Sequence, residues 1–429
     1  MTVRSATLEP PERAVAVRPN VSLALLSVAH AINHAQVALM PLVFIAIIPE
    51  FGIGVADVAL LVTVGNILSG SMQLSFGALT RIAPRRVILG IGNLVFGGAM
   101  AAIAATSSFL PFAATSIVSR VGGAPQHPVG NGLLAEQFPP RRLAFAISAH
   151  IAGGNLGSVA IPLLGGAVIA AAGWQTAVVV FGLPAIVVGV LMLALIRETG
   201  SDRAEARARG SARSLYLSLR HERDLLWLYL SAAIAGGGRG LGVISTFVPL
   251  YLARGLGYDT ATVAAMYTLL LAGSVPAPLV AGWLADRLGH KAMLVATYVG
   301  GAGALVFFAL AGSSPPLLWA AIVLLSLFNF AESPQLQALL ADVTPGAIRD
   351  VAYAVYFTVA FAIGSTWVLL YGGVINALGE AAGFPVVFAL MAAAFLAAAL
   401  AVLPVRAGRR ARVPATGSTA GAGRLEPGP

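Results

Sequence analysis

The chain has 429 residues, of which 58% are hydrophobic and 10% are charged, and its formal net charge is +9. Soluble globular proteins are about 25% charged, so this composition excludes an ordinary soluble domain and indicates a protein whose surroundings are lipid. The basic residues stand in short clusters between apolar runs, which membrane topology explains better than a nucleic-acid-binding surface does.

The polar start of the chain lacks the short apolar core and cleavage site of a signal peptide. A helix needs about 20 apolar residues to cross the hydrocarbon core, and runs of that kind recur about twelve times. They occupy residues 21–48, 56–79, 87–106, 109–137, 143–171, 174–196, 225–253, 260–285, 292–312, 315–341, 351–377 and 383–404. We therefore expect an all-α membrane protein with about twelve transmembrane helices.

The longest polar interval between spans divides them into two sets of six. The predicted parts are a cytoplasmic N-terminal tail (1–19), a six-helix bundle (20–196), a cytoplasmic linker (197–224), a second six-helix bundle (225–404) and a cytoplasmic C-terminal tail (405–429). Loops after even-numbered spans hold the basic clusters, such as Arg85–Arg86 and Arg287–Lys291. The positive-inside rule then places both termini in the cytoplasm.

The two halves resemble each other at a constant offset of 206 residues. "LLAEQFPPRR" (133–142) aligns with "LLADVTPGAI" (339–348), so that Glu136 falls on Asp342. Repeats of this kind are typical of transporters, in which the substrate site lies at the midplane between the halves. The two halves are therefore expected to form pseudo-symmetric bundles.

Polar residues that are costly in lipid share single helix faces within four of the spans. These are His30, Asn33 and His34 in span 1; Arg120, His127 and Asn131 in span 4; Arg239 in span 7; and Asn329, Glu332 and Ser333 in span 10. Pro125 and Pro128 remove backbone donors from span 4, so we expect a kinked helix there.

Two motifs resemble signatures of the major facilitator superfamily. "GWLADRLGHK" (282–291) is similar to its loop signature, and "GSVAIPLLGG" (157–166) is similar to its fifth-helix antiporter signature. "HPVGNG" (127–132) followed by "AGGNLGSVAIPLLGG" (152–166) looks most like the fosmidomycin-resistance exporters within that superfamily. The resemblance implies two six-helix bundles around a cavity lined by spans 1, 4, 7 and 10. It also implies a monomer in the plasma membrane, here the bacterial inner membrane.

These observations predict the residues of a central site. The expected substrate-binding residues are His30, Asn33, His34, Arg120, His127, Asn131, Arg239, Asn329 and Glu332. Glu332, His34 and His127 are the expected proton carriers. A second set lies at the cytoplasmic helix ends and is expected to gate: Glu136, Asp286, Arg287, Lys291 and Asp342. The resemblance implies that Asp286 and Arg287 form an ion-pair latch with neighbouring helices.

The expected function is secondary active transport by alternating access. Two arginines against one carboxylate favour a small organic anion or drug as the substrate, and the antiporter-like motif favours export in exchange for protons. No ATP-binding loop of the Gly-x-x-x-x-Gly-Lys-Ser/Thr type is present. The expected partners are that substrate, protons and the bilayer, with no nucleic acid and no cofactor.

Several alternatives stay open. A proton-coupled importer of an organic acid is the nearest, and a membrane-embedded enzyme with His127, His30 and Glu332 as acid–base groups is a remote one. Arg120 and Glu332 each have a purely structural alternative: Arg120 as a partner of backbone carbonyls, and Glu332 in a static ion pair with one arginine. The His30–His34 pair suggests a metal site, but the chain has no cysteine and the sequence shows no clear third ligand, so no metal is expected.

Overall fold

The computed structural model describes residues 17–80, 82–198, 222–344 and 349–406. Most of the predicted linker and tails, as well as Arg81, lie outside the described residues. Within them the chain forms helices and no strand. The expected all-α membrane fold is confirmed.

The described residues of the first half form six α-helices. They are α1 (Pro19–Phe51), α2 (Val55–Leu79), α3 (Arg85–Ala102), α4 (Phe109–Gly123), α5 (Pro128–Gln137) and α6 (Pro140–Leu195). A 3-10 turn at Ala124–Gln126 joins α4 to α5, so these two short helices form one crossing.

The second half is more often interrupted. Its helices are α9 (Arg223–Ala235), α10 (Ser245–Leu250), α11 (Thr260–Ala272), α12 (Pro276–Leu288), α13 (His290–Leu310), α14 (Pro315–Phe328), α15 (Glu332–Val343), α16 (Arg349–Thr358), α17 (Gly364–Leu378) and α18 (Glu380–Val402). π-helical turns at Gly240–Ile244, Tyr251–Gly255 and Val359–Ile363 connect some of them into longer crossings.

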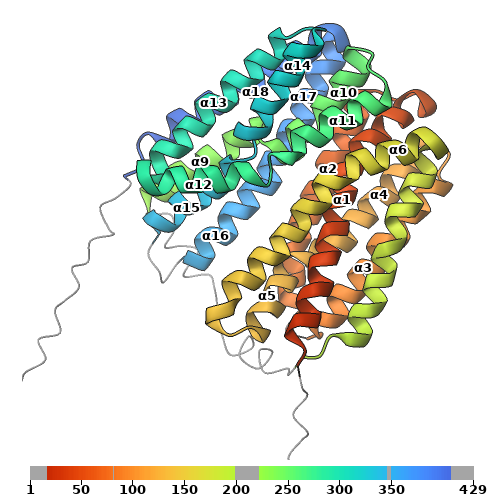
Figure 1. The fold of residues 1–429 in the computed structure, drawn as a ribbon, viewed down its shortest axis with the longest axis vertical. Coiled ribbons are helices and arrows are strands. Elements are labelled where there is room, and N and C mark those ends of the chain that lie inside the picture. The colour runs from red at the N-terminus through yellow and green to blue at the C-terminus, as the bar shows by residue number, and fades with distance from the viewer. Residues whose placement is uncertain (1–16, 81, 199–221, 345–348, 407–429) are drawn as a thin grey trace, which may run out of the picture.

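Nine helical stretches among the described residues are long and apolar enough to cross a membrane. One of them, Phe145–Leu195, contains two crossings, because Gly173 breaks it with a positive φ of 82°. The chain then turns back, and its returning half runs beside α3 in Figure 1. With the crossings α4–α5 and α16–α17, the described residues account for the twelve spans that the sequence predicts.

Small residues let the helices approach closely within each bundle. At Gly157 of α6 an added Cβ would lie 1.9 Å from the carbonyl oxygen of Ala31 in α1. In a bilayer such close backbone packing replaces the hydrophobic driving force that operates in water. Large side chains such as Leu110 and Leu310, each 78% exposed, point outward instead, as expected for a surface that contacts lipid.

The two bundles contact each other mainly at one end of the molecule. The main contacts join α1 to α10, α2 to α17 and to the adjoining π-helical turn, and α6 to α11. The Thr63 hydroxyl donates to the Ser365 carbonyl at 3.0 Å across this seam. Figure 1 shows the bundles diverging toward the opposite end, which carries α5 and α16. The arrangement leaves a central cavity between the bundles.

Candidate functional site

A cavity of about 350 Å³ lies between the two bundles. This is within the usual size range of small-molecule sites. Its polar lining comes from both halves of the chain: Asn33, His34, Gln36, Asn66, Ser69, Arg120, His127 and Ser158 from the first, and Arg239, Ser245, Tyr267, Asn329, Glu332, Ser333, Tyr356 and Ser365 from the second. A space between the bundles that receives polar side chains from both halves is suited to a solute rather than to lipid.

Seven of the nine residues predicted to bind substrate line this cavity. They are Asn33, His34, Arg120, His127, Arg239, Asn329 and Glu332. The other two do not line it: His30 is buried behind the wall at 2% exposure, and Asn131 lies about one turn beyond His127 on α5. The roles assigned to these residues stay predictions.

The break between α4 and α5 positions two of the lining side chains. Arg120 is in the last turn of α4, and His127 directly precedes α5. Pro125 and Pro128 cannot donate backbone hydrogen bonds, and the helix gives way to a 3-10 turn at Ala124–Gln126, which contains Pro125. The kink predicted from the prolines is confirmed.

Arg120 contacts an amide and no carboxylate. Its guanidinium donates to Oδ1 of Asn66 on α2. Among the described residues no acid forms an ion pair with it. Gly65 makes room for this side chain, since an added Cβ there would lie 2.8 Å from Cδ of Arg120. Arg120 therefore contributes a positive charge to the cavity that the protein does not neutralise locally.

Arg239 and Glu332 neutralise each other. Nε of Arg239 donates to one carboxylate oxygen at 3.0 Å, and Nη2 donates to the other at 2.9 Å. Nη1 also donates to the Ala360 carbonyl at 3.3 Å. Because Glu332 is only 1% exposed, this bidentate pair satisfies a carboxylate that would otherwise be costly to bury. Arg239 therefore stays inside the second bundle, paired with Glu332, and does not extend toward the membrane surface.

Interrupted helices hold this pair in place. Arg239 has an extended conformation between the 3-10 turn Gly236–Gly238 and a π-helical turn. The Asn329 side chain donates to the Gly238 carbonyl at 3.0 Å, and the Asn329 carbonyl accepts from the Gly240 amide at 2.9 Å. The freed backbone groups thus find partners inside the protein, which is the condition for irregular backbone at membrane depth.

The residues predicted to gate do not form the expected latch. Arg287 stacks on the Trp283 ring at 3.6 Å, and neither Arg287 nor Asp286 has an ion pair within the described part of the chain. Lys291 donates to the carbonyls of Leu403 and Val405 at 2.6 and 2.8 Å. A latch at this end is not expected to form while the bundles stand apart there.

The aligned acids of the two halves each have a partner in their own bundle. Glu136 forms an ion pair with Arg85 at 2.6 Å. Asp342 contacts Nδ1 of His290 at 2.5 Å. The acids are aligned, but their partners are not: Arg85 aligns with Lys291, which bonds to backbone carbonyls instead. Neither contact crosses between the bundles.

Sequence reasoning missed several lining residues. Asn66 and Ser69 are polar residues in span 2, and their position in an apolar run was the available signal. Tyr356 of α16 is a further lining residue that the sequence did not indicate. Its hydroxyl contacts Oγ of Ser333 at 3.1 Å.

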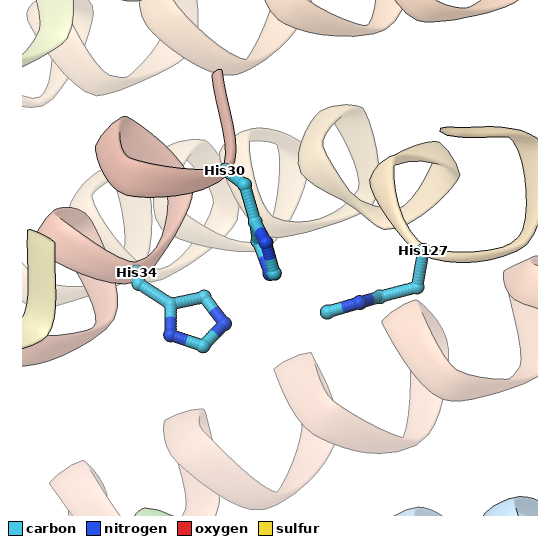
Figure 2. A group of neighbouring side chains, drawn as sticks. All are labelled: His30, His34 and His127. Atoms are coloured by element: carbon cyan, nitrogen blue, oxygen red, sulfur yellow. The ribbon is translucent and has the colours of Figure 1, made fainter. Parts of the chain in front are cut away.

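Four histidines gather on the first-half wall of the cavity. The ring of His30 lies 4.4 Å from that of His34, 4.8 Å from that of His127 and 4.3 Å from that of His150, between centroids. Figure 2 shows His30, His34 and His127 converging on a common space from two different elements. His127 is thus the third imidazole that was not evident beside the His30–His34 pair.

Twelve crossings in two bundles around a polar cavity define a multi-pass membrane transporter rather than an enzyme. The sequence profile of the Major Facilitator Superfamily matches residues 26–368 and 240–424. The chain therefore belongs to the Major Facilitator Superfamily.

Curated relatives are transporters of several kinds. A Na(+), Li(+), K(+)/H(+) antiporter of Planococcus maritimus is 34% identical over 140 residues, 31% of this chain and 32% of that protein. An MFS-type efflux pump of Mycolicibacterium smegmatis is 28% identical over 219 residues, 50% of each chain. A cis,cis-muconate transport protein of Acinetobacter baylyi is 23% identical over 278 residues, 61% of this chain and 64% of that one. Each match spans less than two thirds of the relative's length.

Solved transporter structures share the fold. The nucleoside transporter NupG aligns with a TM-score of 0.73 at 11% identity, over 90% of this chain and 98% of that one. A bacterial homolog of the human lysosomal transporter Spinster, in an inward-facing and unoccupied conformation, aligns with a TM-score of 0.70 at 15% identity, over 90% of this chain and 95% of that one. At these identities the likeness establishes the fold alone.

Proposed function

We propose that this transporter exports a small organic anion in exchange for protons. The observation that carries the proposal is the charge of the cavity. Among the charged side chains that line it, Arg239 and Glu332 neutralise each other, and Arg120 is left with an amide partner. A single uncompensated guanidinium in a low-dielectric space attracts an anion strongly.

The chemistry of the guanidinium narrows the substrate class. Its planar fork of donors matches carboxylate, phosphate or phosphonate groups in bidentate contacts. Asn33 and Asn66 add amide groups on the same side of the cavity. One relative is named for the transport of muconate, an organic acid. The resemblance to fosmidomycin-resistance exporters adds phosphonate drugs to the candidates.

We assign proton coupling chiefly to Glu332. It is the carboxylate that lines the cavity, and its partner Arg239 is anchored separately by the Ala360 carbonyl. His34 and His127 stay predicted as further carriers. A potential of about 100 mV supplies about 2.3 kcal/mol per charge, and one pH unit supplies about 1.4 kcal/mol.

The proposed topology assigns the open end to the cytoplasm. The bundles 20–196 and 225–404 would rock about the seam, with the tails 1–19 and 405–429 and the linker 197–224 on the cytoplasmic side. The helix ends that carry Arg85 and Lys291 lie at the open end, and basic loops favour the cytoplasm. The proposed setting is the bacterial inner membrane, and the proposed state is a monomer.

Ligand-induced stabilisation of the purified protein tests the substrate class. Melting temperatures are measured with a panel of carboxylates, phosphates and phosphonates, since a bound ligand stabilises the folded state by mass action. We expect an anion to raise the Tm of the wild type and of Arg254→Gln, whose arginine pairs with Glu380 away from the cavity. Arg120→Gln should lose that response. An equal response in Arg120→Gln would contradict anion binding at this residue.

Measuring the direction of transport distinguishes export from the alternative function, which is the uptake of an organic acid. An antiporter and an efflux pump among the relatives favour export. Inverted membrane vesicles that are energised to pump protons inward should accumulate the anion identified by the melting screen. Accumulation in right-side-out vesicles instead would establish the importer.

A further inference from the structure

The roles proposed above for His34 and His127 do not explain why three imidazoles converge at one place. His30, His34 and His127 each place one imidazole nitrogen within 4.8 Å of the other two. His34 and His127 line the cavity, and His30 is buried behind them. If each of these histidines served only to form hydrogen bonds with its own neighbours, the three rings would not need to lie so close together.

The hydrogen bonds of the cluster orient its lone pairs. Nδ1 of His30 lies 2.8 Å from the carbonyl oxygen of His150. A carbonyl only accepts, so Nδ1 carries the proton and Nε2 carries a lone pair. Nε2 of His30 is buried and has no hydrogen-bond partner among the described residues. An unsatisfied buried acceptor is costly, so this atom points to a ligand.

The same pattern extends to a second histidine. Nδ1 of His34 lies 3.2 Å from Oγ of Ser158, which leaves its other nitrogen toward the cluster. Metal-binding histidines characteristically use one ring nitrogen for the metal and donate the other N–H to an oxygen that fixes the ring. His30 has such an oxygen in the His150 carbonyl, and His34 has one in Ser158.

We propose that His30, His34 and His127 form a binding site for a divalent transition metal of the zinc class. Three imidazoles with a fourth position open to the cavity are a standard tetrahedral arrangement for Zn²⁺. Imidazole nitrogen also suits Co²⁺, Ni²⁺ and Cu²⁺, whereas Ca²⁺ and Mg²⁺ require oxygen ligands. Water or an anionic group of a solute would occupy the fourth position.

Binding requires a modest contraction of the cluster. Zn–N bonds of 2.0–2.1 Å place tetrahedral nitrogens about 3.3 Å apart. Rotations of the rings about χ2, which has a broad energy profile in histidine, bring the nitrogens together. Gly154 leaves room for the far edge of the His30 ring, since an added Cβ there would lie 2.9–3.0 Å from Cε1, Nδ1 and Nε2.

The break in span 4 makes the site possible. His30 and His34 are separated by one helical turn on α1, so their rings share a face. His127 stands at the start of α5, where the 3-10 turn ends. This inference rests on the geometry of the cluster and is independent of the solute and direction proposed above.

Cobalt absorption tests the site directly. The full-length protein is purified with a histidine-free tag and titrated with Co²⁺ in detergent. We expect one Co²⁺ per chain, with the intense visible bands of tetrahedral coordination, and displacement of Co²⁺ by Zn²⁺ but not by Mg²⁺ or Ca²⁺.

Variants distinguish this cluster from a surface site. His34→Ala and His127→Ala should each weaken Co²⁺ binding by more than about a hundredfold, because the loss of an outer-shell partner alone costs 10–100-fold. His290→Ala is the matched control. His290 is the first residue of α13, where it pairs with Asp342 and does not line the cavity. His34→Gln, which keeps a contact with Ser158, replaces His34→Ala if the latter fails to elute as a monodisperse peak.

Three results would overturn the inference. The first is a Co²⁺ spectrum with only octahedral bands, and the second is an unchanged Co²⁺ affinity in both His34→Ala and His127→Ala. The third is a loss of Co²⁺ binding in His290→Ala as large as that in His127→Ala. A tetrahedral spectrum that disappears only in the cluster variants supports it.

Discussion

Arg120 and Arg239 line the same cavity, but within the part of the chain that the structure describes only Arg239 has its charge neutralised by a neighbouring residue. Arg239 meets a carboxylate through two hydrogen bonds, so its charge is compensated before any solute arrives. Arg120 meets the Asn66 amide, which orients the guanidinium without cancelling its charge. Composition cannot distinguish the two residues, because the difference lies in the neighbour that another helix supplies. Two predictions separate their roles.

Replacing Arg120 by lysine keeps the charge and removes the planar fork. We expect anion affinity to fall about ten- to hundredfold, since a hydrogen bond to a charged group contributes about 1.5–3 kcal/mol and lysine acts as a point charge. Isothermal titration with the anion found in the melting screen measures the change. Equal affinity in Arg120→Lys would assign the arginine a structural role.

Replacing Glu332 by glutamine removes the titrating group and keeps an acceptor for Arg239. We expect loss of transport driven by a pH gradient, while exchange of the anion across proteoliposomes without a gradient continues. Breaking a buried pair outright costs about 3–5 kcal/mol, so a smaller loss of Tm is expected here. Gradient-driven transport at the wild-type rate would exclude Glu332 as the proton carrier.

At the scale of elements, several of the crossings that line the cavity are broken, whereas α1 and α2, which also line it, are continuous. Span 4 breaks between α4 and α5, span 7 breaks around Arg239, and span 10 breaks between α14 and α15. The sequence predicts the first break, because Pro125 and Pro128 remove donors. It does not predict the second, because glycines 236–238 are compatible with either close helix packing or unwinding.

The limits of prediction from sequence follow from this difference. Apolar length identifies the spans, and helical spacing assigns polar residues to a shared face. Neither apolar length nor helical spacing shows which residue of another helix lies opposite a given side chain. The Arg239–Glu332 pair and the contact between Arg120 and Asn66 are therefore seen only in the folded structure. The latch expected for Asp286 depends on conformation, which a sequence does not specify.

The N-terminus of α11 offers a prediction about stability and pH. Asp259 accepts hydrogen bonds from the Thr262 hydroxyl at 2.7 Å and from the amides of Thr262 and Ala261 at 3.0 and 2.9 Å. These bonds, the Thr262 hydroxyl first, lower the pKa of Asp259 below its ordinary value of 3.8. The carboxylate therefore stabilises the fold above that pH, and the stabilisation is lost as the pH falls through the lower pKa of the folded state.

We expect Asp259→Ala to melt below the wild type at neutral pH, and Asp259→Asn, which keeps a capping oxygen, to lie close to it. The difference in Tm between the wild type and Asp259→Ala should stay constant at neutral and mildly acidic pH and should become smaller below pH 3.8. Differential scanning fluorimetry across that pH range measures the Tm of the wild type and of both variants. A gap that widens on acidification would contradict the capping role.

At the scale of the molecule, the seam between the bundles is a contact of small residues. An added Cβ at Gly372 of α17 would lie 2.3 Å from the Cβ of Ala59 in α2. Thr63 and Ser365 continue the seam with a hydrogen bond. Alternating access requires this seam to open while the other end closes, and small side chains let the helices approach without interlocking.

A larger residue at Gly372 should hold the seam open. We expect Gly372→Leu to slow transport and to expose the cavity from the seam side, because the leucine side chain cannot fit against Ala59. The chain has no cysteine, so Ser69→Cys, placed in the cavity lining, serves as a single reporter. Labelling with a membrane-impermeant thiol reagent from each face of the membrane measures its accessibility.

Gly373→Leu is the matched control for this test. Gly373 is exposed, and an added Cβ there meets nothing within 4 Å, so labelling and transport should match those of the Ser69→Cys parent. In Gly372→Leu the reagent should react faster from the seam side than it does with the parent. If both leucine variants label alike, the seam does not control access to the cavity, and the rocking of the bundles must pivot elsewhere.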